Sequence, residues 1–328
     1  MITENAYDEY LSTHGGSSNA FTDLEHTCYY FDVQPDSLEG ALDRFAQCFI
    51  GPLFTQSAIE REIQAVDSEH AKNLQQDMWR CYQLSKSRMV SKSHPFASFG
   101  SGNQKSLPIL NIREKLLEYY QKHYRRNLSL YKLVVLGKES IDDLEAMVKR
   151  YFTDLVEQFR ELTTNVHANE AKEQDSRSAI LDEFFPTLLD QLQLPQRLHV
   201  IPIAETHSVE LQFPLREIHS LYKCKPTRYL SHLIGHEGKG SLLSLLKSYH
   251  YAQELYADDS SKSCHGFSVF TIKIDLTESG LKNVNDVIRM IFAYIDLLKT
   301  SGPQEWVQEE LETVAELTVR QFAAFNIF

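Results

Sequence analysis

The chain has 328 residues and a formal net charge of −12, with 42% hydrophobic and 24% charged residues. This length exceeds what one hydrophobic core usually serves, so two domains are expected. The acidic balance excludes nucleic acids and anionic membranes as non-specific partners, because both need a basic surface.

Cysteine usage and hydropathy indicate the compartment. The cysteines are scattered and form no C-x-x-C pair: Cys28, Cys48, Cys81, Cys224 and Cys264. This pattern favours a reducing compartment over a disulfide framework. No apolar run reaches the roughly 18 residues that span a bilayer, and the N-terminus lacks a basic region followed by an apolar one. We therefore expect a soluble, cytoplasmic protein with no membrane partner.

The first half of the chain alternates predicted helices and strands. A short helix is expected over 5–13, a strand over 19–33, and a helix that begins at the N-cap Asp36 and ends at Gly51-Pro52. The following elements are one long helix over 57–87, a loop, a helix over 107–123, a buried strand over 128–137 and a helix capped by Ser140.

The apolar periodicity disappears between Phe159 and Asp182. This predicts a linker over 161–182 that separates a first domain, 1–160, from a second domain, 183–328. The second domain is expected to hold strands at 197–203, 207–215 and 266–276 and helices near 226–235, 240–250, 281–299 and 303–326.

Two stretches of the chain resemble each other. FDVQPDSLEGAL and IDLTESGLKNV both contain the end of a strand at an aspartate, Asp32 or Asp275, with Leu38 or Leu281 six positions later. Each is followed by a helix, a Gly-Pro pair and a second helix with acidic residues. This favours two copies of one α+β unit, with chance similarity as the alternative.

The stretch EREIQAVDSEHAKN, residues 60–73, concentrates carboxylates on a predicted helix. Ile59, Ile63 and Val66 form its apolar stripe, so Glu62 and Glu69 share one face beside that stripe. A solvated face is the common outcome for such a helix, and a carboxylate that holds a cation is the alternative. Neither H-E-x-x-H nor H-x-x-E-H occurs, so the stretch offers one possible ligand and no complete zinc site.

Other chemistries find less support in the sequence. No G-x-S-x-G elbow is present, and GHEGKGS at 235–241 lacks the spacing of a phosphate-binding loop. Its glycines precede an apolar helix, which fits a helix-entry turn or a close approach to a ligand. The strand that begins SSNAFT could pair with an extended peptide if it lies at a sheet edge, or could be an ordinary edge guarded by Asp23 and Glu25.

Several collinear blocks together resemble one family. They are HGGSSNAFTDLEHTCYYFDV, ALDRFAQCFIGPLF, EREIQAVDSEHAKN, HPFASFGSGN and HLIGHEGKGSLLSLLK. These blocks resemble the insulin-degrading enzyme (insulysin) family of inverzincin zinc metallopeptidases, of which nardilysin is a close relative. The resemblance implies an α+β fold of two homologous α/β sandwich domains, each an antiparallel-rich sheet packed by helices. The first would be truncated at its N-terminus and the second at its C-terminus.

The resemblance also implies a metal site. Family members hold Zn²⁺ through two histidines of H-x-x-E-H and a distant glutamate, which Glu69 matches, with Glu62 supporting it by outer-shell contacts. The H-x-x-E-H segment is missing from this sequence, so the two histidines and the glutamate base are missing too. We therefore assign no catalytic residue and expect an inactive N-terminal-half fragment of a zinc metalloendopeptidase for short or unfolded peptides. The remainder of the peptidase is a candidate partner.

Peptide-binding residues follow from the same resemblance. SSNAFT resembles the edge strand that pairs with the substrate, and HLIGHEG resembles the exosite that anchors a peptide N-terminus. The implied residues are Asn19, Ala20 and Phe21 along the cleft, Trp79 and Tyr82 as pocket walls, and His232, Gly235, Glu237 and Leu255 in the exosite. Ala257 and Asp259 depart from the family's Gly and Gln in the exosite strand.

Two other interpretations stay open. The chain could be a non-catalytic peptide-binding or regulatory fragment, or an incomplete gene sequence whose missing ends restore a normal enzyme. Peptide selectivity is open between the insulysin type and the dibasic preference of nardilysin. The long acidic insertion of nardilysins is not apparent, which favours insulysin.

Overall fold

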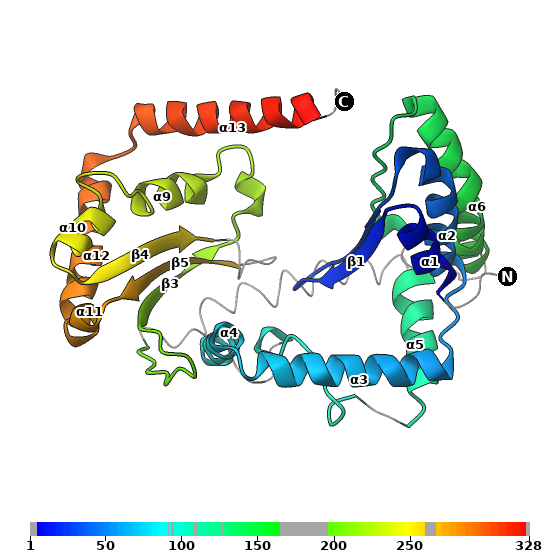
Figure 1. Ribbon diagram of the computed structural model, residues 1–328, viewed down its shortest axis with the longest axis horizontal. Coiled ribbons are helices and arrows are strands. Elements are labelled where there is room, and N and C mark those ends of the chain that lie inside the picture. The colour runs from blue at the N-terminus through cyan, green and yellow to red at the C-terminus, as the bar shows by residue number, and fades with distance from the viewer. Residues whose placement is uncertain are drawn as a thin grey trace. The chain divides into compact units, whose positions relative to one another are not determined.

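A computed structural model describes residues 5–90, 92, 95–107, 110–125, 128–164, 196–259 and 267–325. Its contacts divide the chain into two compact units, residues 1–179 and 180–328. Each unit combines helices with a small antiparallel sheet, as Figure 1 shows, which confirms the predicted α+β class. The predicted linker begins inside a helix, since residues 161–164 are helical, and its remainder lies outside the described residues.

The first unit begins with helix α1 (Ala6–Thr13) and a hairpin of strands β1 (Ser17–Thr22) and β2 (Thr27–Asp32). The prediction of one strand over 19–33 is therefore wrong. The Asp23 N–H donates to the His26 carbonyl oxygen (2.8 Å), and the Asp23 carboxylate accepts from the Leu24 N–H (2.7 Å). This side-chain hydrogen bond is typical of a turn. Because Asp23 and Glu25 lie in the turn, they do not guard a strand edge.

Helix α2 (Leu38–Ile50) buries one apolar face of Leu38, Ala41, Leu42, Phe45 and Ala46. Its predicted N-cap is wrong, because Asp36 lies in the 3-10 turn Pro35–Ser37 and pairs with Lys138 while Ser37 takes the cap position. The Phe45 ring packs against Phe31 and Phe49, with centroids 5.1 Å from each. These aromatic contacts join α2 to the hairpin.

The long helix predicted over 57–87 is two helices, α3 (Gln56–Asn73) and α4 (Asp77–Met89). The chain leaves α3 through tightened turns, in which the Gln75 N–H donates to the Lys72 carbonyl oxygen and the Gln76 N–H to that of Asn73 (both 3.1 Å). Asn73 is a weak helix former because its side chain competes for backbone hydrogen bonds. No glycine or proline marks this break, so periodicity alone missed it.

Helix α5 (Ile112–Tyr119) continues as a π-helical turn, Tyr120–Arg125, and α6 spans Ile141–Thr164. The predicted cap of α6 is confirmed, since the Ser140 hydroxyl accepts from the Asp143 N–H (3.2 Å). The buried strand predicted over 128–137 is wrong: Val134 and Leu136 are 89% and 83% exposed. A strand needs a hydrogen-bonded neighbour, and no strand in the described part of the chain pairs with this segment.

The second unit is built on a three-stranded antiparallel sheet in the order β3-β5-β4: β3 (Ser208–Arg216), β5 (Phe267–Leu276) and β4 (Ala252–Asp258). The strands predicted at 207–215 and 266–276 are confirmed. The strand predicted at 197–203 is wrong, because that segment is irregular and Ile201 is 86% exposed. A short apolar run indicates burial potential but does not identify a strand partner.

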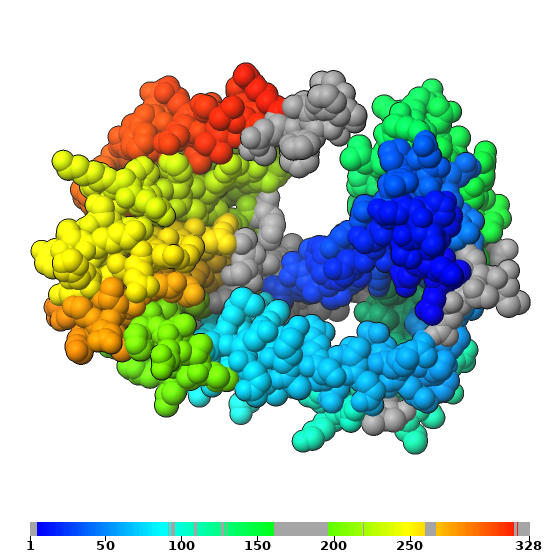
Figure 2. Space-filling model, viewed as in Figure 1, coloured from blue at the N-terminus to red at the C-terminus, as the bar shows by residue number. Residues whose placement is uncertain are grey.

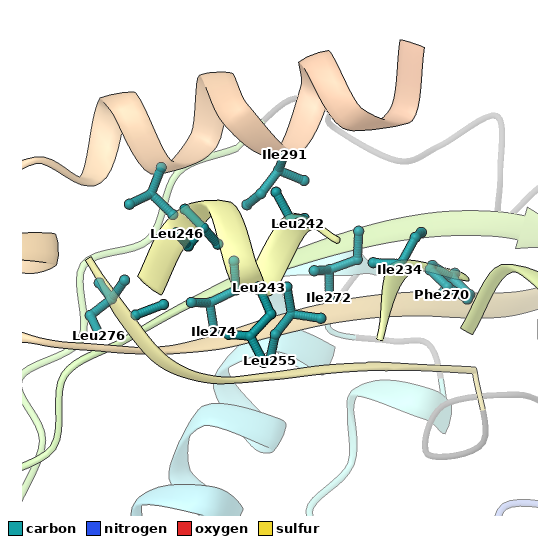
Figure 3. Close-up of a cluster of buried hydrophobic side chains, with 12 residues drawn as sticks. Ile234, Leu242, Leu243, Leu246, Leu255, Phe270, Ile272, Ile274, Leu276 and Ile291 are labelled. Atoms are coloured by element: carbon teal, nitrogen blue, oxygen red, sulfur yellow. The ribbon is translucent and has the colours of Figure 1, made fainter. Parts of the chain in front are cut away.

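The described helices of the second unit are α9 (Pro226–Ile234), α10 (Leu242–Ser248), α11 (Glu278–Lys282), α12 (Val284–Ser301) and α13 (Glu305–Phe325). Side chains of α9, α10 and α12 form the core with the strands, and α13 packs against α9. Figure 3 shows α10 placing Leu242, Leu243 and Leu246 between α12 and strand β5, which carries Ile272 and Ile274. This apolar layer holds α10, and the turn before it, in a fixed place.

The two similar stretches occupy equivalent elements. The chain runs β2, α2, Gly51-Pro52 and α3 in the first unit, and β5, α11, α12, Gly302-Pro303 and α13 in the second. Gly302 has φ 68°, a conformation that favours glycine, whereas Gly51 has a negative φ of −154°. Among the described helices, none has the length and apolar character needed to cross a bilayer.

Candidate functional site

Glu62 and Glu69 lie on the exposed flank of α3. Ile59 and Ile63 on the same helix are buried, whereas both glutamates are exposed. Seven residues of helix place them about two turns, or roughly 10 Å, apart along the axis. Figure 2 shows α3, in light blue, with side chains open to the surface of its unit. Both carboxylates are therefore accessible to a cation or a ligand.

The described residues do not assemble a metal site around Glu69. No group of three or more His, Cys, Asp or Glu side chains among them could hold a metal ion. The neighbouring His70 is already engaged, because Asn103 Nδ2 donates to its Nε2 and its Nδ1 bonds to Ser101 Oγ (both 3.2 Å). A zinc site needs about three protein ligands, so these residues alone do not fit the metal.

The loop after α4 docks on the opposite flank of α3. The Gln104 N–H donates to the Asp67 carboxylate (3.0 Å), and the Gln104 amide donates to Gln64 Oε1 (3.0 Å). The Phe99 ring lies edge-on to the His70 imidazole, with centroids 4.7 Å apart. The loop thus occupies one side of α3 and leaves the side with Glu62 and Glu69 open.

The same loop also binds α4. Gln83 Nε2 donates to the Ala97 carbonyl oxygen (2.7 Å), and Lys86 Nζ donates to that of Ser98 (2.9 Å). One and two turns earlier on α4, the rings of Tyr82 and Trp79 meet edge to face, with centroids 6.1 Å apart. The structure therefore brings together the two aromatic residues expected to form pocket walls.

Strand β1 carries the residues expected to meet a peptide backbone. All of its side chains are exposed, and its partner on one side is β2. The Ala20 N–H donates to the side chain of the adjacent Asn19 (2.8 Å). The Phe21 ring contacts His26 (5.8 Å between centroids) and Tyr30 (6.5 Å); no ring contact among the described residues joins it to Trp79 or Tyr82.

A cavity of about 530 Å³ lies beside β1. Asn19 and Ala20 contribute to its wall together with a set of aromatic residues that includes Tyr29, Tyr119 and Tyr124. The hydroxyls of Tyr29 and Tyr124 are hydrogen-bonded (2.6 Å), and burial is the main cause that raises the pKa of Tyr29. The wall of this cavity is mainly aromatic.

The exosite candidates gather where α9 ends. His232 Nε2 lies 3.3 Å from Glu310 Oε2 of α13, and the Gln304 N–H donates to the Tyr229 hydroxyl (2.6 Å), which ties α9 to α13 (Figure 1). Gly235 caps α9, and a Cβ there would lie 2.8 Å from the Ser231 carbonyl oxygen. The close approach explains the glycine, and the exposed Glu237 follows it.

The neighbouring strand β4 presents two different faces. Leu255 is 5% exposed and belongs to the core beneath α10, while Tyr256 is exposed. The pKa of Tyr256 is raised, first by its hydrogen bond to Glu254 and then by burial. The Leu255 side chain supports this surface from below.

Reasoning from the sequence missed the residues that hold the loop, namely Asp67, His70, Gln83 and Lys86. The one available signal is the position of Lys86, which shares a helix face with Trp79 and Tyr82 at i, i+3 and i+7. A lysine on an aromatic face indicates a cation held against rings. The contacts of His70 with Ser101 and Asn103 span more than thirty positions and have no local signature.

Comparison with known proteins decides the family. Residues 2–92 match the family described as Insulinase (Peptidase family M16), and residues 111–314 match the Peptidase M16 inactive domain. The chain belongs to peptidase family M16. The predicted insulysin-type resemblance is thereby confirmed.

Relatives within family M16 align over almost the whole chain. The chain is 41% identical to insulin-degrading enzyme of Homo sapiens and 39% identical to a nardilysin-like protein of Arabidopsis thaliana, in each case over 97% of its length. The chain spans 29% and 30% of the lengths of these relatives. The crystal structure of pitrilysin covers 96% of the chain with a TM-score of 0.74 at 23% identity, and the chain covers 32% of it, which supports the fold.

Proposed function

We propose that this chain supplies the peptide-holding walls and one carboxylate ligand of a zinc-dependent metalloendopeptidase that degrades short or unfolded peptides, as in the insulysin type. The observation that carries the proposal is membership of peptidase family M16 combined with the open flank of α3, on which Glu69 is exposed. Glu62, about two turns away on the same flank, would support it.

Peptide binding by strand addition is supported by the exposure of β1. An added strand gains affinity from main-chain hydrogen bonds and specificity from alternate side chains. The Asn19 side chain now accepts from the Ala20 N–H, and a peptide carbonyl would replace it there. Phe21, Trp79 and Tyr82 would then contact peptide side chains.

The end of α9 supports an anchor for a peptide N-terminus. The exposed Glu237 carboxylate offers a charge-assisted hydrogen bond to an ammonium group. Gly235 brings the backbone close, and His232 is steadied by Glu310. Because the Leu255 side chain is buried, β4 would contribute backbone and Tyr256 rather than Leu255 itself.

The zinc proposal concerns the complete enzyme. The described residues do not fit a zinc ion by themselves, so no chemical step is derived through it. That lack of a three-ligand group also favours a second candidate function, a non-catalytic peptide-binding or regulatory role for the chain as given. The two candidates share the peptide site and differ in hydrolysis.

Domain boundaries and compartment complete the proposal. We place a zinc-site domain at 1–160, a linker at 161–182 and a second peptidase-like domain at 183–328. The free thiols of Cys28, Cys48, Cys81 and Cys224 are compatible with a reducing compartment, and we assign the chain to the cytoplasm.

The test measures binding of a short unstructured peptide with one central phenylalanine to the full chain. In an extended strand, alternate N–H groups point toward opposite edges. N-methylation of one alternate set should therefore abolish binding, and N-methylation of the other set should leave it intact. No binding of the unmethylated peptide, or equal loss with both sets, would overturn strand addition. Cleavage that a chelator stops would favour the peptidase over the binding role.

A further inference from the structure

Lys86 is a charged group in an enclosed position. The residue is 3% exposed, and its ammonium donates to the Ser98 carbonyl oxygen at 2.9 Å. It also lies over two aromatic rings, 4.9 Å from the Tyr82 centroid and 5.2 Å from the Phe96 centroid. Among the described residues no carboxylate pairs with it, so a carbonyl oxygen and two ring faces compensate for its lost hydration.

The segment that Lys86 binds connects two helices. We call residues 96–104 the strap. Its first part is held on α4 by Gln83 and Lys86, and its second part is held on α3 by Asp67 and His70. Since α3 and α4 are separate helices joined by a short turn, the strap adds a second connection that limits how one helix moves against the other.

We call the rings of Trp79 and Tyr82 the aromatic wall. The strap and the aromatic wall both contact Lys86 or its neighbours on α4. Tyr82 receives the ammonium on its ring face and the Trp79 ring edge to face. At Gly100 of the strap, a Cβ would lie 4.0 Å from Trp79 Cζ3, which places the strap backbone against that ring. The position of the aromatic wall therefore depends on Lys86, whose ammonium donates to the Ser98 carbonyl oxygen.

We propose that Lys86 is a positioning residue that acts through Tyr82. Its ammonium fastens the strap to α4 and fixes the Tyr82 ring in the wall that receives a peptide side chain. Lys86 itself, at 3% exposure, does not touch the peptide. The role of the wall rests on the proposed function, whereas the fastening of the strap does not.

The first experiment follows the strap alone, in the full chain. Lys86→Met keeps the aliphatic stem and removes the charge and the donor. Loss of a charged hydrogen bond should speed amide exchange in the strap about tenfold or more, with the Gln104 amide as reporter. Exchange in α2 should not change. The control is Lys72→Met, which removes an exposed lysine from α3.

Native exchange in the strap of Lys86→Met would overturn the fastening. Exchange that rises equally in the strap and in α2 would also overturn it, because the loss would then belong to the whole unit. If Lys86→Met does not fold, Lys86→Gln replaces it, since this amide still offers a donor and lacks the charge over Tyr82. A folded Gln variant with native affinity for the peptide of the second experiment would contradict the positioning role.

The second experiment measures affinity for the phenylalanine peptide used above. With Trp306 replaced by Phe, Trp79 is the remaining tryptophan, and its fluorescence reports occupation of the wall. Lys86→Met should weaken binding about tenfold when Tyr82 is present and have little effect in a Tyr82→Leu background. Tyr82→Phe keeps the ring and should preserve the effect of Lys86.

Additive losses from Lys86→Met and Tyr82→Leu would overturn action through Tyr82, since a merely structural lysine would weaken both backgrounds alike. Absence of peptide binding in the unsubstituted chain would count against the proposed function and against the positioning role. The exchange experiment would still decide whether Lys86 fastens the strap, so the two failures are distinguishable.

Discussion

At the scale of single residues, burial of its charge separates Lys86 from the candidate ligand Glu69 and from Glu62. Glu62 and Glu69 keep their hydration, so they can be replaced at little cost to stability. Lys86 has exchanged water for a carbonyl oxygen and two ring faces. Removing a partner from a buried charge lowers stability. The position of the Lys86 ammonium therefore depends on the segments that carry its partners.

The pH dependence of stability offers a check on Lys86. Burial lowers its pKa below the ordinary value of 10.5. Between that lowered pKa and 10.5, the unfolded chain binds a proton that the native chain does not, so this residue makes the free energy of unfolding rise with pH. Lys86→Met lacks this contribution. The unfolding free energy of the unsubstituted chain minus that of Lys86→Met should therefore increase as pH approaches 10.5.

Urea unfolding of both proteins in the Trp306→Phe background, followed by Trp79 fluorescence at a series of pH values, measures this difference. The raised pKa values of Tyr29 and Tyr131, which burial causes, destabilise both proteins alike as tyrosines ionise in the unfolded chain above 10.0. Their effect cancels in the comparison. A difference that stays constant with pH would show that burial does not depress the pKa of Lys86.

At the scale of elements, helices were predictable because their signal is local. The apolar spacing of Leu38, Leu42 and Phe45 identified α2, and Ser140 identified the start of α6. The break between α3 and α4 had no glycine or proline to mark it. Its cause is the hydrogen bonding of Gln75 and Gln76, which only the folded chain shows.

Strands were less predictable because a strand depends on its neighbour. β3 and β5 pair over their whole length, and the sequence identified both. The segments at 128–137 and 197–203 have a similar apolar character and form no strand. The candidate site divides in the same way: the family resemblance predicts Glu69, Trp79 and Tyr82 as site residues, whereas the strap contacts join distant residues and could not be predicted.

The close contact of α11 with Tyr251, the residue before β4, gives a stability prediction. A Cβ at Gly280 would lie 1.9 Å from the Tyr251 carbonyl oxygen, so the backbone must move to admit it. The Thr277 hydroxyl also accepts from the Gly280 N–H (3.0 Å), which fixes the start of α11. Gly280→Ala should therefore lower the free energy of unfolding of the second unit by about 2 kcal/mol or more.

The control is a glycine of the first unit. Gly51 has no atom within 4 Å of an added Cβ, and its φ is negative at −154°. Gly51→Ala should change the unfolding free energy by less than about 0.5 kcal/mol. Denaturant unfolding of both variants gives the comparison, and equal losses would contradict the steric explanation.

At the scale of the whole molecule, the chain belongs to a peptidase family, while its described residues form no group of three metal ligands. The chain aligns along almost its whole length with peptidase relatives and spans 29% of the human relative's length. Its fold provides an open carboxylate flank, an aromatic pair and an exposed strand in the first unit, and a glycine-capped turn with Glu237 in the second. The proposed function assigns these features to holding a peptide, and hydrolysis would in addition need a complete zinc site.

Metal retention tests this contrast. The described residues offer Glu69 without a group of three ligands, and a tetrahedral zinc site needs about three from the protein. Purified chain that is loaded with zinc and then dialysed should therefore keep far less than one ion per chain, as measured by atomic absorption. Glu69→Gln should not change the small amount of zinc that remains bound. Stoichiometric zinc that disappears in Glu69→Gln would mean that other residues of this chain complete the site, and peptidase activity would then be expected from the chain itself.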